Sequence, residues 1–290
     1  MPFISYLAIL IISFFFNIIP RKISLLAGRI FGATIYYLFP IRKKVALKNI
    51  KDNFPEFTHK QCMGILKQTY IHFGMVLVDF LRTKQLNTEN IKKIVNMNEK
   101  TIKTLNEYAG SIIMTGHIGN WEYFLPAFGL NSLKFSIVAQ TIKNSYLNKL
   151  FLKIRTLKNV EIIFKEEGKE KMLRALKNES HLGLASDQNA GDKGEKVSLL
   201  KSEISIPKGA AIFHLKTKKP IFIGYCIMNK NLTYDFKLEK LNTDDINFSR
   251  KDSIKKINQN FAKSLEKMIT KYPNQYFWFH KMINKADYKK

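Results

Sequence analysis

The chain has 290 residues, of which 46% are hydrophobic and 24% are charged, which is the composition of an ordinary globular protein. The formal net charge is +25, from 48 Lys and Arg against 23 Asp and Glu, and the lysines are spread without a compact basic repeat interleaved with aromatic residues. We therefore expect an anionic membrane surface as the first partner of this charge and an acidic carrier protein as the second, and we do not expect nucleic acid.

The first predicted element is an uncharged apolar segment over residues 3–19. As a helix it would be roughly 26 Å long, close to the thickness of the hydrocarbon core of a bilayer. No basic residue precedes it, as one would in a signal peptide, whereas Arg21 and Lys22 follow it directly. We therefore predict an N-terminal membrane anchor over residues 1–22, either spanning the bilayer or lying deep in one leaflet, with the body on the cytoplasmic face.

Residues 23–105 are predicted to form a helical membrane-docking region. The apolar segment 23–41 carries Arg29 in its middle, which favours an interfacial or docking helix over a second span or an ordinary core helix. From residue 45 to 105 the apolar residues recur at helical spacing, with a break at residues 54–56.

Residues 106–290 are predicted to form an α/β core, because short apolar runs alternate with amphipathic segments. The predicted strands are 111–115, 135–139, 161–164, 181–186, 221–228 and 232–238. The predicted helices are 120–128, 144–157, 169–177, 207–216 and 253–269. We expect the strands to form a mixed sheet with helices on its faces. The two cysteines, Cys62 and Cys226, have no paired-ligand spacing, so we expect neither a disulfide framework nor a metal site.

The strongest candidate for catalysis is His117, which follows the first strand of this core at the rim of the predicted sheet. Glu122 lies five residues later, in the first turn of the next predicted helix. From there its carboxylate could reach the imidazole and fix its tautomer, leaving the other nitrogen free to take a proton. The spacing alone fits equally well a histidine that satisfies a backbone group in a turn.

Two further charged residues are candidates for the same site. Arg155 falls at the edge of the buried stripe of its helix, where it either pairs at the surface or points into the cleft beside His117. Asp187 follows an apolar strand and so lies at a strand end like His117, although an ordinary turn aspartate is as common there.

Several motifs follow one another in order and cover most of the chain. They are Arg42-Lys43-Lys44-Val45, Asn49-Ile50, Phe54-Pro55-Glu56, Gly116-His117-Ile118-Gly119-Asn120-Trp121-Glu122, Arg155, Asp187-Gln188 and Gln275-Tyr276-Phe277-Trp278-Phe279-His280. Together with the apolar amino terminus, they resemble the late acyltransferases of lipid A biosynthesis, the lauroyl and myristoyl transferases of Gram-negative inner membranes. That family is a branch of the glycerolipid and lysophospholipid acyltransferases.

The resemblance implies a glycerolipid acyltransferase-like fold and an enzyme without a cofactor. It implies that His117 acts as the general base and Glu122 as its orienter, while a lipid A precursor accepts an acyl chain from an acyl thioester, with acyl-acyl carrier protein as the expected donor. Gly119, by its backbone amide, and Arg155 become candidate donors to the oxyanion. Asp187 would organise Arg155 or contact the head group of the acceptor, and Asn120 is a weaker candidate for substrate binding.

Two other functions remain open from the sequence. The same histidine and glutamate would serve an acyltransferase whose acceptor is a lysophospholipid or another glycolipid. A membrane-bound lipid-binding protein without chemistry would carry the same apolar amino terminus and the same basic charge.

Overall fold

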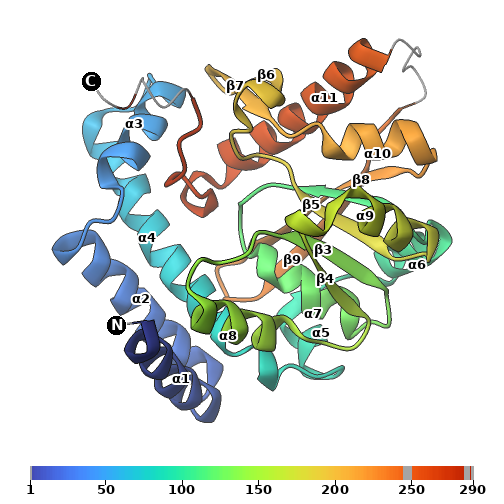
Figure 1. Cartoon of the computed structure of the whole chain (residues 1–290). Helices are drawn as coiled ribbons and strands as arrows, with labels where there is room; N and C mark the ends of the chain where they lie inside the picture. Colours follow the sequence, from blue (N-terminus) through green and yellow to red (C-terminus); the bar gives the residue numbers. More distant parts are fainter. Residues whose placement is uncertain (1, 244–249, 284–287, 289–290) are drawn as a thin grey trace.

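The computed structural model describes residues 2–243, 250–283 and 288. Its first part is a layer of four helices at one end of the molecule (Figure 1). These helices are α1 (Pro2–Ile18), α2 (Arg21–Leu38), α3 (Lys43–Asn53) and α4 (His59–Leu81). The break between α3 and α4 falls at residues 54–58, where Pro55 disfavours a continuous helix and a capping box between Thr58 and Gln61 begins α4.

Helices α2 and α4 pack against each other at unusually close range. A Cβ atom on Gly74 would lie 2.2 Å from the carbonyl oxygen of Gly28, and one on Gly32 would lie 2.3 Å from that of Tyr70. Only glycine allows this approach, so these glycines fix where the two helices cross. As a result α2 buries one face on α4 and leaves its apolar opposite face exposed.

The rest of the chain forms an α/β body around a sheet of seven strands in the order β1-β9-β8-β2-β5-β3-β4. The strands are β1 (Val95–Asn96), β2 (Ile112–Thr115), β3 (Phe135–Ala139), β4 (Val160–Phe164), β5 (His181–Ala185), β8 (Ile221–Met228) and β9 (Tyr234–Lys240). Strands β2, β5, β3 and β4 run parallel, and β9 is antiparallel to β8. The predicted mixed sheet is therefore confirmed.

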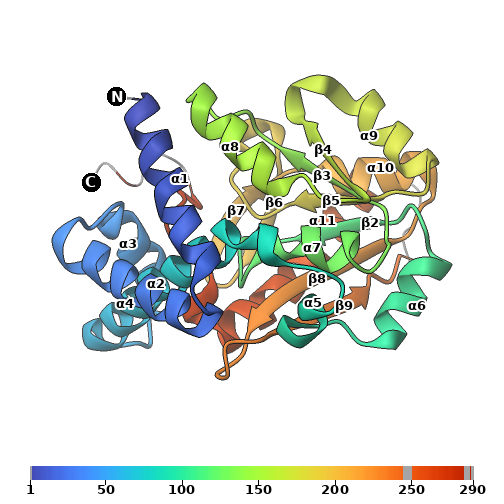
Figure 2. The same ribbon diagram turned by 90° about the horizontal axis from the view of Figure 1, so that it is seen from below.

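Helices cover both faces of this sheet (Figure 2). They are α5 (Asn90–Ile94), α6 (Glu99–Glu107), α7 (Phe124–Gly129), α8 (Ser145–Arg155), α9 (Gly168–Lys177), α10 (Gly209–Thr217) and α11 (Arg250–Lys271). The side chains of β2 alternate between the faces. Ile112 and Met114 belong to the core that also contains α9, α10 and α11, and Ile113 belongs to the core that contains α7.

Every predicted core strand is found within a few residues of its expected bounds, and each predicted helix of the core is present. Three strands were not predicted: the two-residue β1, and β6 (Glu195–Leu199) with β7 (Ser202–Ile206), which form a separate antiparallel hairpin. Residues 120–128 begin as a short 3₁₀ turn, η2 (Trp121–Tyr123), before α7.

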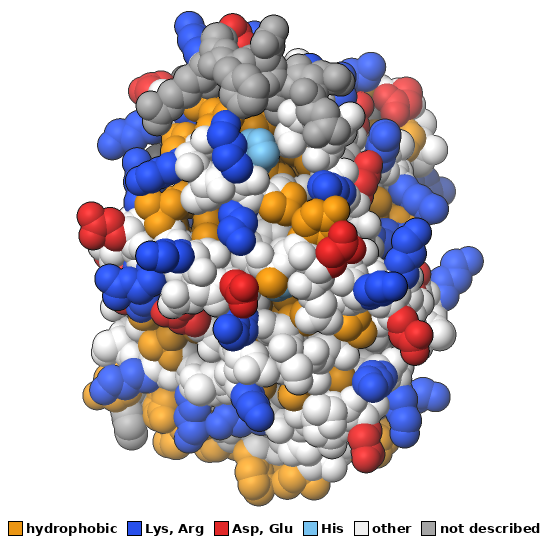
Figure 3. All heavy atoms as spheres, turned by 90° about the vertical axis from the view of Figure 1, so that its right-hand side faces the viewer, with side chains coloured by type: hydrophobic (Ala, Val, Ile, Leu, Met, Phe, Trp, Pro, Cys, Tyr) orange, Lys and Arg blue, Asp and Glu red, His pale blue; other side chains and the backbone are white. Residues whose placement is uncertain are grey.

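The membrane anchor remains a prediction. Among the described residues, no single helix is both long and apolar enough to cross a bilayer, although α2 and α3, bent by 95°, pass that test as a pair. On the face turned away from α1 to α4, the described Lys and Arg side chains are interspersed with Asp and Glu (Figure 3).

Candidate active site

The site lies where β2 and β5 end side by side. These neighbouring parallel strands pair Thr115 with Ala185 at their carboxyl ends. His117 and Asp187 each follow two residues after that pair, so the parallel register brings the two side chains together. This is the edge of the sheet at which α/β proteins place their ligands.

His117 and Asp187 make two hydrogen bonds. The backbone N–H of His117 donates to Oδ2 of Asp187 over 2.8 Å, and Nδ1 of the ring lies 2.7 Å from Oδ1. The carboxylate is fully buried, whereas the imidazole is 17% exposed. Because Oδ1 can only accept when ionised, Nδ1 carries the proton, and the lone pair of a neutral ring is on Nε2. The Nε2 atom lies 3.3 Å from the side-chain nitrogen of Gln188.

The pKa values support an ionised carboxylate beside a basic imidazole. Burial would lower the pKa of His117, but the charge and hydrogen bond of Asp187 outweigh it and raise that pKa above its ordinary value, with a smaller contribution from Glu122. Burial would raise the pKa of Asp187, yet His117 lowers it to about 2. Asp187 is therefore ionised across the physiological range, and His117 can gain and lose a proton.

Glu122 does not hold the imidazole. Its two carboxylate oxygens accept hydrogen bonds from Nε and Nη2 of Arg155 over 2.9 and 2.6 Å. Glu122 is part of η2, which turns its side chain toward the end of α8, where Arg155 lies. The expected partners are thus exchanged: Asp187 takes the place beside His117 that we assigned to Glu122, and Glu122 takes the place beside Arg155 that we assigned to Asp187.

Gly119 and Asn120 make their hydrogen bonds to other parts of the core and not to His117. Gly119 has a φ of +65°, and a Cβ atom there would lie 2.0 Å from the carbonyl oxygen of Cys226, so the position requires glycine. Its N–H donates to the carbonyl of Gln275 over 2.9 Å, and its carbonyl lies 3.2 Å from Nε2 of His72. The predicted oxyanion donor at Gly119 is therefore already engaged.

Asn120 is buried away from His117. Its Nδ2 lies 3.2 Å from the hydroxyl of Tyr234, and its backbone N–H donates to Cys226. The amides of Trp121 and Glu122 begin η2 and have no backbone partner in the described part of the chain. Of the amides near Gly119, these two are therefore the ones not engaged by another backbone group within the described residues.

An aromatic wall lies beside the imidazole. It consists of Phe73 from α4, Trp121 from η2 and Phe277 from the segment after α11, and all three are partly exposed. The ring centroid of Trp121 lies 4.8 Å from that of His117, and Phe277 lies 5.2 Å from Phe73. The polar edge of the site thus adjoins an apolar surface.

The segment after α11 is a part of the site that sequence reasoning did not assign. Ile118 forms an antiparallel bridge with Tyr276, and the N–H of Phe277 donates to the carbonyl of His117 over 2.8 Å. The signal was its run of aromatic residues ending in His280, because apolar rings beside a polar residue outside regular elements suggest a packed site.

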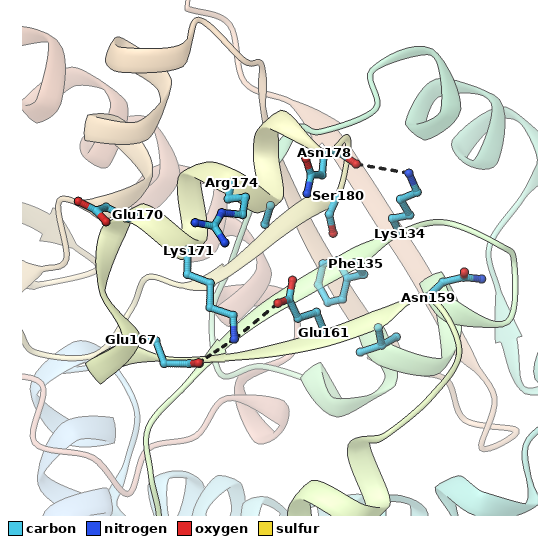
Figure 4. Close-up of a pocket in the computed structure, with 12 residues that line it drawn as sticks. Lys134, Phe135, Asn159, Glu161, Glu167, Glu170, Lys171, Arg174, Asn178 and Ser180 are labelled. Carbon is cyan, nitrogen blue, oxygen red and sulfur yellow. Dashed lines mark hydrogen bonds and ion pairs between the residues drawn. The ribbon is translucent and has the colours of Figure 1, made fainter.

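A separate cavity of about 640 Å³ opens at the other end of the strands, between α9 and the beginnings of β3 and β4 (Figure 4). Two of its acidic groups pair with one of its lysines, since Lys171 lies 2.7 Å from Glu167 and 3.6 Å from Glu161. No predicted site residue lines it. Within the described residues, no group of three His, Cys, Asp or Glu side chains is arranged to hold a metal ion.

A family of proteins described as bacterial lipid A biosynthesis acyltransferase matches residues 2–285, which is nearly the whole chain. No curated protein matches the chain.

Proposed function

This chain belongs to the bacterial lipid A biosynthesis acyltransferase family and is therefore an acyltransferase, and from that premise we propose that it transfers a fatty acyl chain from an acyl thioester to a hydroxyl of a lipid A precursor at a membrane surface. The observation that carries the proposal is the His117–Asp187 pair. A buried carboxylate holds one ring nitrogen, and the other nitrogen lies on the more exposed side of the pair.

In the proposed reaction, Nε2 of neutral His117 takes the proton of the acceptor hydroxyl as its oxygen attacks the carbonyl carbon of the thioester. Asp187 stabilises the imidazolium that forms. The tetrahedral intermediate then breaks its C–S bond, the ester forms, and the thiolate leaves with the proton from His117. No group of the enzyme needs to be acylated, because the acceptor itself supplies the nucleophile.

The oxyanion of the intermediate needs donors, and two sources are close to the site. The amides of Trp121 and Glu122 are available at the start of η2. Arg155 uses Nε and Nη2 for Glu122, which leaves the N–H groups of Nη1 for another ligand. We assign Glu122 the role of holding Arg155 in place, and Arg155 the role of binding the oxyanion or an anionic group of a substrate.

The aromatic wall suits the apolar part of the substrates. Phe73, Trp121 and Phe277 present partly exposed rings next to His117, so an acyl chain laid on them would lose contact with water close to the reacting carbonyl. The donor would be carried by acyl carrier protein, an acidic partner for a chain with a net charge of +25.

The exposed apolar surface supports docking on a membrane. Exposed large hydrophobic side chains gather on α1, α2 and the turn that follows: Leu7, Ile11, Ile12, Phe14, Phe15, Ile18, Ile23, Leu26, Ile30, Phe31, Tyr37, Leu38, Phe39 and Ile41. Lys43 and Lys44 begin α3 directly beyond this surface, where they would meet anionic head groups. We propose that this surface lies in the bilayer interface on the cytoplasmic side of the inner membrane.

A matched pair of variants tests the docking. Phe14 is 63% exposed on α1, and Phe14→Glu should release a measurable part of the protein from sedimented membranes, because a buried charge is costly in hydrocarbon. Asn106→Glu adds the same charge on the exposed side of α6 and should leave sedimentation unchanged. Equal behaviour of the two variants would argue against docking through α1.

The reaction itself is tested by mass spectrometry of lipid A. Cells that express the wild-type chain should contain lipid A heavier by one acyl group than cells that lack it, and cells that express His117→Ala should not. Purified enzyme assayed with acyl carrier protein and coenzyme A thioesters then identifies the donor. If lipid A is unchanged but a lysophospholipid or another glycolipid is acylated, that lipid is the acceptor. If no lipid of any class is acylated, the proposal is refuted.

A further inference from the structure

The side chain of Gln188 covers the nitrogen of His117 that the proposed reaction uses. Its amide nitrogen lies 3.3 Å from Nε2 of the ring. An amide nitrogen only donates, so Nε2 accepts here, which agrees with the proton that the bond to Asp187 places on Nδ1. Within the described residues, these two contacts are the hydrogen bonds that the ring makes. A group that gives its proton to Nε2 must therefore take the place of the Gln188 amide.

The backbone on both sides of Gln188 is fixed, whereas its side chain is free to move. Asp187 is buried and bonded to His117. Asn189 donates from Nδ2 to the carbonyl of Ile283 over 2.9 Å. The side chain of Gln188 is exposed, and the contact with Nε2 is the only hydrogen bond that it makes to the described part of the chain. The amide can thus leave Nε2 without breaking another bond and stay within reach of the site.

A hydroxyl that enters between Nε2 and the Gln188 amide can bond both of them. Its proton points to Nε2, and one of the two lone pairs on its oxygen accepts from the amide N–H. The other lone pair is left for the attack on the thioester carbonyl carbon. The two side chains together therefore orient the nucleophile as well as remove its proton.

We propose that Gln188 receives the acceptor hydroxyl: its amide caps Nε2 of His117 in the free enzyme and, once the hydroxyl displaces it, donates to the hydroxyl oxygen. This role rests on the proposed acyl transfer. As the O–H bond breaks, the proton goes to Nε2 and the electron pair stays on the oxygen. A lone pair of that oxygen forms the new C–O bond, while the π electrons of the thioester carbonyl move to the carbonyl oxygen. The bond from Gln188 strengthens as negative charge grows on the attacking oxygen, so it favours the transition state.

The charged and titratable groups that act on the His117 ring from the described residues come from three elements. Asp187 acts on it from the end of β5 and Glu122 from η2. His280 acts on it from the segment after α11. Of the described side chains, none of these three is hydrogen-bonded to Nε2. A charge placed at position 188 would therefore act on a ring nitrogen that has no ionised partner in the structure.

The contact is tested first without substrate, by an NMR titration of ¹³C-labelled histidines in the full chain, with the His117 signal identified by its absence in His117→Gln. Gln188→Glu keeps the shape of the side chain but puts a carboxylate beside Nε2. Because that carboxylate stabilises the imidazolium, the pKa of His117 should rise by about one unit or more. The control is Gln140→Glu, which adds the same charge at an exposed position directly after β3, the strand next to β5. It should shift the titration by less than about a third of a unit, because solvent screens the charge.

Acylation kinetics then test the hydrogen bond to the hydroxyl. Gln188→Met keeps the length of the side chain and removes its donor, and Gln188→Glu replaces the donor by an acceptor. Both should lower kcat/KM for the acceptor lipid by about 10- to 100-fold. In Gln188→Glu the loss should persist above the raised pKa of His117, because the missing donor causes it. KM for the thioester should stay within about threefold of the wild-type value, since the donor does not bind Gln188.

The outcomes separate this role from the proposed function. An equal shift of the His117 pKa in Gln188→Glu and Gln140→Glu would overturn the contact. An unchanged kcat/KM for the acceptor in Gln188→Met, with an active wild-type chain, would overturn the role of Gln188 alone. A wild-type chain that acylates no lipid would refute the proposed function, and the role of Gln188 with it. The histidine spectra show whether each variant is folded before its kinetics are compared.

Discussion

Two fully buried aspartates, Asp187 and Asp79, have similar surroundings and opposite uses. Asp79 on α4 accepts two hydrogen bonds from Arg21 over 2.8 and 2.7 Å and one from the hydroxyl of Tyr234 over 2.7 Å. Asp187 accepts two from His117 over 2.8 and 2.7 Å. Both carboxylates have no exposed side-chain surface. The difference lies in the cation.

Arg21 is charged at every pH that matters, and its pairing with Asp79 raises its pKa against the lowering effect of burial. That pair cannot exchange a proton. It holds the start of α2 against α4 and, through the Tyr234 hydroxyl that also bonds Asp79, against β9. His117 titrates, and part of its ring is exposed. A buried carboxylate therefore stabilises structure when its partner is permanent, and prepares chemistry when its partner can lose a proton.

The largest expected effect comes from replacing His117, the partner that titrates. His117→Ala should lower turnover by about 10²- to 10⁴-fold, because general base catalysis is typically worth that much. The free energy of unfolding should fall as well, because Asp187 is left as a fully buried carboxylate without its ring partner, so turnover is compared on variant protein that is folded. Acylation kinetics of the purified variant measure this, with His59→Ala at the exposed start of α4 as the control. Turnover within a few fold of wild type would refute the role of His117.

The second effect concerns the Asp79–Arg21 pair. Asp79→Ala leaves the Arg21 charge without its buried partner and should lower the free energy of unfolding by about 3–5 kcal/mol. Denaturant titration measures it, and Asp52→Ala, which removes an exposed pair with Lys48, should cost only about 0–1 kcal/mol. If the two variants lose equal stability, the Asp79–Arg21 pair stabilises the fold no more than an exposed ion pair does.

A smaller effect is expected for a change at Glu122, and it distinguishes the role of Glu122 from that of Asp187. Glu122→Gln weakens the bond to Arg155 without touching the His117 ring, and a hydrogen bond to a charged group is worth about 1.5–3 kcal/mol, or roughly 10- to 100-fold in rate. The pH at the acid limb of kcat/KM should move down slightly, because Glu122 contributes only a minor part of the raised pKa of His117. A limb that moves by more than a unit would assign the orienting role to Glu122.

The smallest effect is the position of that acid limb in the wild-type enzyme. His117 must be neutral to accept a proton, and Asp187 raises its pKa above the ordinary value of about 6.5. Activity should therefore fall as the pH drops through a value higher than about 6.5. A pH profile of kcat/KM checks this, and a limb below about 6 would contradict the ion pair.

The sequence predicted the site's strands better than its side-chain partners. The apolar runs of β2 and β5 and the polar residues after them were readable, because buried strands are uniformly apolar and end where polar residues begin. That both Asp187 and His117 lie at strand ends was a usable signal. Which strands are neighbours was not readable, and the register of β2 with β5 is what brings Asp187 to His117.

Glu122 was assigned to His117 because it is close in sequence. The direction in which its side chain points depends on two features: η2 is a 3₁₀ turn rather than the regular helix we expected, and Arg155 lies within hydrogen-bond distance at the end of α8. Asn120 was misplaced for a similar reason: its side chain lies 3.2 Å from Tyr234, which is also the donor to Asp79. Such long-range hydrogen bonds leave no periodicity in the sequence, so only the folded chain reveals them.

The most direct test of the account is a double-mutant cycle for turnover between His117 and Asp187, with His117 and Glu122 as the comparison. If Asp187 acts through His117, then Asp187→Asn should cost a large factor in the wild type and almost none in the His117→Ala background, since residues that act as a unit are not additive. Glu122→Gln should cost nearly the same factor in both backgrounds. Additive losses for His117 and Asp187, with coupling instead between His117 and Glu122, would contradict the account.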